Sequence, residues 1–137
     1  MKEGWIGKSN LILFDDGESE RVTKGYGVSL YLPGHRVVAL VGWDDLVVEN
    51  EQGRRFRVPT VPMDESHMTA LDEDYDPAEL VPDPGAAGKI KWYLQPVILG
   101  GNPHPGDNVT WVSLEDHQKL VRWWNRKYRE ILEKEER

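Results

Sequence analysis

The sequence contains no cysteine, and this absence limits both its chemistry and its location. A disulfide framework, a thiolate zinc site and a cysteine nucleophile are excluded, and the composition is typical of a reducing compartment. The start MKEGWIGKSN lacks the apolar run of an export signal, and no stretch approaches the ~20 apolar residues of a membrane span. We therefore expect a cytoplasmic protein with no membrane partner.

Positive charge is also scarce. The chain has 17 Lys and Arg against 24 Asp and Glu, a net charge of -7 and a pI of about 5.1. Duplex nucleic acid is bound by clustered basic side chains that displace counterions, so we predict no nucleic-acid partner. A basic protein partner is the better expectation.

The acidity is concentrated in residues 58–88, which contain no Lys or Arg at all. The eight acidic residues of this segment are Asp64, Glu65, Asp72, Glu73, Asp74, Asp76, Glu79 and Asp83. They predict either a solvated loop or an anionic surface that docks a cationic partner. The alternation of Asp72, Asp74 and Asp76 is also compatible with a calcium loop, although Pro77 stands where that motif requires glycine.

We predict a single domain over 1–137 with an α+β fold. The β-rich part, 1–59, is expected to form an antiparallel curved sheet or small open barrel, with DDGES as a turn and YGVSLYL as a strand. An acidic, proline-rich loop follows over 60–88, and a strand with a Gly/Pro loop over 89–112. The capping box of Ser113 and Asp116 predicts a long amphipathic helix over 113–136, packed on the sheet.

Two adjacent tryptophans in this helix cannot both face the core, because neighbouring helical residues point about 100° apart. Trp124 falls in the apolar arc with Val121 and Tyr128, whereas Trp123 lies among charged residues. Trp123 is either covered by the loops before the helix or exposed as an anchor for a partner. His117 lies in the middle of the apolar arc, where a hydrogen-bonded core histidine and a ligand are the two alternatives.

The segment GGNPHPGDNVTWVSLEDHQ holds the one candidate for metal chemistry. His104, Asp107 and His117 could converge as a metal-dependent hydrolase site, faintly resembling the second half of HNH-type nucleases. The alternative is that Asp107 and Asn108 form an ordinary Asx turn. Since the sequence has no nucleophile elbow and no H-E-x-x-H motif, we predict a protein that is not an enzyme, with no catalytic residue, metal or cofactor.

The tail LGGNPHPGDNVTWVSLEDHQKLVRWWN resembles the ends of bacterial immunity proteins of the SUKH kind. The matching positions are Gly100, Gly101, Pro103, Asp107, Asn108, His117, Trp124 and Asn125. The resemblance implies an α+β, non-enzymatic protein that neutralises a toxin by tight binding. Our main hypothesis is such an immunity protein, which occludes a basic active site of a toxin or effector with its acidic segment and Trp123. The rivals are the metal-dependent hydrolase and a structural domain that dimerises through Trp123; the sequence leaves the oligomeric state open.

Overall fold

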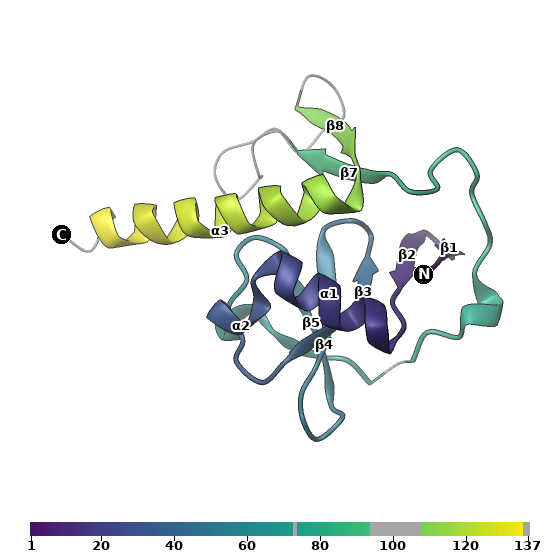
Figure 1. Cartoon of the computed structure of the whole chain (residues 1–137), viewed down its shortest axis with the longest axis horizontal. Helices are drawn as coiled ribbons and strands as arrows, with labels where there is room; N and C mark the ends of the chain where they lie inside the picture. The colour runs from purple at the N-terminus through teal and green to yellow at the C-terminus, as the bar shows by residue number, and fades with distance from the viewer. Residues whose placement is uncertain (73, 94–107, 136–137) are drawn as a thin grey trace.

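A six-stranded antiparallel sheet and a long helix dominate the fold, which is α+β as predicted (Figure 1). The computed structural model describes residues 1–72, 74–93 and 108–135. The open sheet follows chain order through β1 (Lys2–Ile6), β2 (Ser9–Leu13), β3 (Arg36–Val41), β4 (Asp45–Glu49), β5 (Arg55–Pro59) and β6 (Thr69–Ala70). Strands β3 to β5 are the runs RVVALV, DLVVE and RFRVP of the predicted β-rich part, and NEQG lies in the connection between β4 and β5.

The segment between β2 and β3 is helical, so the expected turn at DDGES and strand at YGVSLYL are wrong. Asp15 caps the N-terminus of helix α1 (Asp16–Tyr26). Its side chain accepts a hydrogen bond from the Glu18 amide, and the Glu18 carboxylate accepts one from the Asp15 amide. This capping box satisfies amides that a turn would leave to solvent. Gly27, with φ 69°, ends α1, and the short α2 (Val28–Tyr31) follows.

The long C-terminal helix α3 (Leu114–Glu135) confirms the prediction from the sequence, and the Asp116 amide donates to Ser113 Oγ. His117, Val121 and Asn125 are its fully buried residues. The helix packs against α1 and β7, and both amide and carbonyl of the Asn125 side chain bond to the chain that follows β5. Its C-terminal end extends beyond the sheet in Figure 1. Leu132, near this end, is exposed, although the 100° spacing places it on the same arc as Val121 and Tyr128.

The acidic segment contains short ordered elements. It runs through the 3-10 turn η1 (Glu65–His67), the edge strand β6 and the 3-10 turn η2 (Pro77–Glu79), then pairs Val81 with Trp5 of β1. A separate hairpin, β7 (Ile90–Tyr93) with β8 (Val109–Val112), precedes α3. No helix among the described residues is long and apolar enough to cross a membrane.

Candidate binding site at the turn between β3 and β4

A pocket of about 220 Å³ opens where β4 begins, β5 ends and β7 packs against them. Its described lining residues are Asp44, Asp45, Pro59, Thr60, Val61, Trp92 and Tyr93. Antiparallel pairing builds it, because Asp45 lies opposite Pro59 and the Thr60 amide donates to the Asp44 carbonyl over 2.8 Å. The volume is below the roughly 300–1,000 Å³ of sites for drug-sized ligands, so one side chain or a small ion is the matching size.

The turn beside the pocket has an unusual backbone. Gly42 and Trp43 both have positive φ angles, 60° and 62°, and a bulky residue in this region costs about 1–3 kcal/mol. The Trp43 indole lies edge-to-face between Trp5 and Trp111, with ring centroids 5.4 and 5.2 Å away. Two such aromatic pairs contribute about 0.5–1.5 kcal/mol each, which offsets the strain of the turn.

Asp44 is the carboxyl of this site whose charge is least compensated. Asp44 is exposed as a whole residue, but the atoms around its carboxyl partly remove that group from water. This desolvation and repulsion by Asp45 raise the pKa of Asp44 to about 6, and attraction to Lys91 lowers it. Asp45 pairs with Arg57 Nε over 2.6 Å, whereas no described residue forms an ion pair with Asp44. Asp44 therefore lines the pocket as an unpaired acid.

His117 lies behind the pocket and is a core residue. Its Nδ1 is 2.7 Å from the Tyr26 hydroxyl, and its ring packs edge-to-face on Trp92 at 5.2 Å. Burial lowers the pKa of His117 to about 3, against a smaller opposing effect of the Trp43 backbone, so the ring is neutral near pH 7. Burial also raises the pKa of Tyr26, which keeps its hydroxyl protonated.

Of the three residues of the predicted metal site, the structure describes His117. His104 and Asp107 lie outside the described residues, and His117 is fully buried with a tyrosine as its hydrogen-bond partner. Within the described ranges no group of three or more potential metal-ligating side chains occurs. Asp72, Asp74 and Asp76 accordingly form no metal-binding group there.

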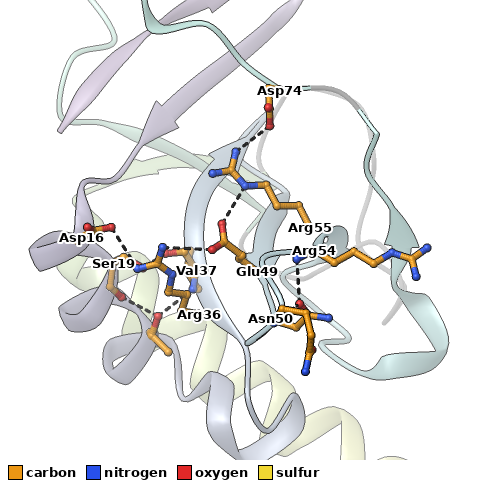
Figure 2. A network of polar contacts seen from close by, with 11 residues as sticks. Asp16, Ser19, Arg36, Val37, Glu49, Asn50, Arg54, Arg55 and Asp74 are labelled. Atoms are coloured by element: carbon orange, nitrogen blue, oxygen red, sulfur yellow. Dashed lines mark hydrogen bonds and ion pairs between the residues drawn. The ribbon is translucent and has the colours of Figure 1, made fainter.

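Four of the predicted acidic contact residues make contacts within the chain. Asp64 caps η1 and pairs with His67, Asp76 caps η2, and Asp83 accepts from Trp5 Nε1 over 3.1 Å. Asp74 ends a surface chain of ion pairs that runs from Asp16 through Arg36, Glu49 and Arg55, at 3.0 to 3.3 Å per contact (Figure 2).

The other predicted acids differ from these. Glu65, Asp72 and Glu79 are exposed and have no ion pair with any described residue, whereas Glu73 lies outside the described part of the chain. Among the described residues of the segment, these three carboxylates have no ion pair to give up when a partner binds.

Trp123 is half exposed, at 51%. Its ring packs edge-to-face on Trp124, with 4.8 Å between the ring centroids. Two helical steps separate Trp123 from the fully buried Asn125, so it points to the opposite side of α3. Asn125 bonds to Met63, where the acidic segment starts. Trp123 and the start of that segment consequently lie on different sides of the helix.

The pocket residues were not among the sequence predictions. Trp92 and Thr60 are buried, and packing that the sequence does not specify brings Trp92 and Tyr93 of the separate β7–β8 hairpin to Asp44. The sequence feature that could have indicated the pocket is GWDD, a tryptophan and two carboxylates in a tight turn between two apolar runs. Comparison of the chain with protein-family models, with curated proteins and with solved structures found no match.

Proposed function

We propose that this chain is a non-enzymatic bacterial binding protein of the cytoplasm, an immunity protein that neutralises a toxin or effector. The half-exposed Trp123 is the observation that carries the proposal. Tryptophan is enriched among residues that dominate binding energy, and its indole loses unfavourable contact with water when a partner covers it. Trp111, 48% exposed on β8, offers a second aromatic contact.

The acidic segment supplies a second contact surface, which starts on the other side of α3 from Trp123. Glu65, Asp72 and Glu79 are exposed carboxylates in a chain of net charge -7. Such a surface attracts a basic partner and accelerates association, and acidic side chains would occlude a cationic active site such as one that handles nucleic acid. The resemblance of the tail to SUKH-type immunity proteins points to the same function.

Site-specific photocrosslinking tests this proposal in cells. A photoreactive phenylalanine analogue is placed at Trp123, and in a matched control at Leu30, which is 74% exposed on α2. We expect a toxin or effector to crosslink from position 123 and not from position 30. Equal capture at both positions, or no adduct at position 123, would contradict the proposal.

The same observation supports a second candidate, dimerisation through the Trp123 face. An exposed tryptophan on a helix can also pack on its own copy in a twofold interface. This candidate predicts crosslinked dimers from position 123 and a dimer in sedimentation equilibrium that Trp123→Ala dissociates. A monomer at high concentration would eliminate it.

A further inference from the structure

The pocket beside the β3–β4 turn combines three features of a cation site. Trp92 and Tyr93 are among its lining residues, Asp44 supplies a carboxyl with no ion pair among the described residues, and Trp43, next to Asp44 in the turn, contacts the half-exposed Trp111. Aromatic faces attract cations through their negative quadrupole, and a carboxylate adds charge.

Among the described residues, no cation forms an ion pair with Asp44. Arg57 is engaged by Asp45 over 2.6 Å. Lys91 lies over the Tyr93 ring, 5.7 Å from its centroid, and influences Asp44 without approaching it within ion-pair distance.

We infer that this pocket binds an arginine side chain of the protein partner, with the guanidinium at Asp44 and its aliphatic stem against the other lining residues, Trp92 and Tyr93 among them. Arginine fits better than lysine, because its planar group stacks on aromatic rings, meets a carboxylate with two parallel hydrogen bonds and is more weakly hydrated. The inference rests on the proposed function for the identity of the partner. It adds a further contact point, on the β7–β8 hairpin and the β3–β4 turn.

The pocket is testable without the partner. The probe is the peptide acetyl-Gly-Arg-Gly-amide, and the control is the same peptide with citrulline, a neutral analogue of arginine. Binding is followed by NMR through the indole N–H signals, which Trp92→Phe and Trp111→Phe assign. We expect millimolar binding of the arginine peptide that shifts these signals, and about tenfold weaker binding of the citrulline peptide.

Two variants complete the experiment. Asp44→Asn should weaken binding of the arginine peptide by about tenfold, whereas Glu20→Gln, at an exposed acid on α1, should leave it unchanged. Equal shifts with arginine and citrulline, or full binding by a folded Asp44→Asn protein, would overturn the inference.

A pH titration of the unaltered protein provides an independent measurement. Binding should weaken from pH 7.5 to pH 5, since protonation of Asp44 removes its charge; Asp45, Arg57 and Lys91 are the charged neighbours that modulate this step. Constant affinity over this range would count against the inference. Failure of the crosslinking experiment would remove the proposed function but not peptide binding, so the two failures are distinguishable.

Discussion

Trp43 shows at the scale of one residue how the fold maintains a strained turn. Replacement by glycine relieves the positive φ but removes the contacts with Trp5 and Trp111. Because the lost contacts and burial exceed the relieved strain, we expect Trp43→Gly to lower the free energy of unfolding by about 2 kcal/mol in urea titration. Gly42→Ala, which introduces strain where no atom lies within 4 Å, should cost about 1 kcal/mol. A neutral or stabilising Trp43→Gly would show that the indole contacts contribute little.

His117 predicts a specific pH dependence of stability. Its folded pKa of about 3 lies below the usual histidine value of 6.5, so the unfolded chain binds this proton more readily. The free energy of unfolding should therefore decrease as the pH falls from about 6.5 towards 3, with a limiting slope of about 1.4 kcal/mol per pH unit from this group. Chemical denaturation at several pH values measures the slope. The slope should diminish in His117→Gln and persist in His35→Gln, a surface histidine; identical slopes in both variants would contradict the assignment.

At the scale of elements, Asn125 joins α3 to the sheet. Its Oδ1 accepts from the Met63 amide and its Nδ2 donates to the Thr60 carbonyl, each over 2.7 Å and each buried. Asn125→Ala leaves both groups unsatisfied, and we expect a loss of about 2–4 kcal/mol in the free energy of unfolding. Asn50→Ala, in the exposed β4–β5 connection, should cost less. A smaller effect at Asn125 than at Asn50 would refute this role.

Gly4 permits the acidic segment to pair with β1. A Cβ atom at this position would lie 2.8 Å from the Val81 carbonyl oxygen. Gly4→Ala should therefore break the two backbone hydrogen bonds between Trp5 and Val81, and hydrogen exchange of these amides should accelerate at least tenfold. Gly17→Ala, where the new Cβ has ordinary space in α1, should leave the Trp5 and Val81 amides protected. Unchanged protection in Gly4→Ala would contradict the close approach.

The elements differ in how far the sequence reveals them. Apolar runs and the Ser113 capping box predicted β3 to β5 and α3, because their signals are local. Helix α1 was not predicted, because Gly17, Gly25 and Gly27 suggested turns. The capping box of Asp15 and Glu18 is the sequence feature that indicates its start. The pocket depends on how the β7–β8 hairpin packs beside the end of β5 and on a backbone conformation at Trp43 that no residue pattern specifies.

At the scale of the whole molecule, the distribution of charge makes a prediction about association. Replacement of Glu65, Asp72 and Glu79 by lysine should slow binding to the partner by at least about tenfold at low salt, and added salt should reduce the difference. The control replaces the exposed acids Glu20, Glu51 and Glu133 by lysine and so changes the net charge equally. Association rates from surface plasmon resonance distinguish a local acidic surface, which predicts different rates, from net charge alone, which predicts equal ones.

The most direct test of the central claim is protection of growing cells. The protein crosslinked from position 123 is expressed as a toxin under an inducible promoter, together with the unaltered chain, Trp123→Ala or Leu30→Ala. We predict that the unaltered chain and Leu30→Ala restore growth and that Trp123→Ala, present at equal level, does not. Growth that is independent of the chain, or full protection by Trp123→Ala, would contradict an immunity protein that acts through this face of α3.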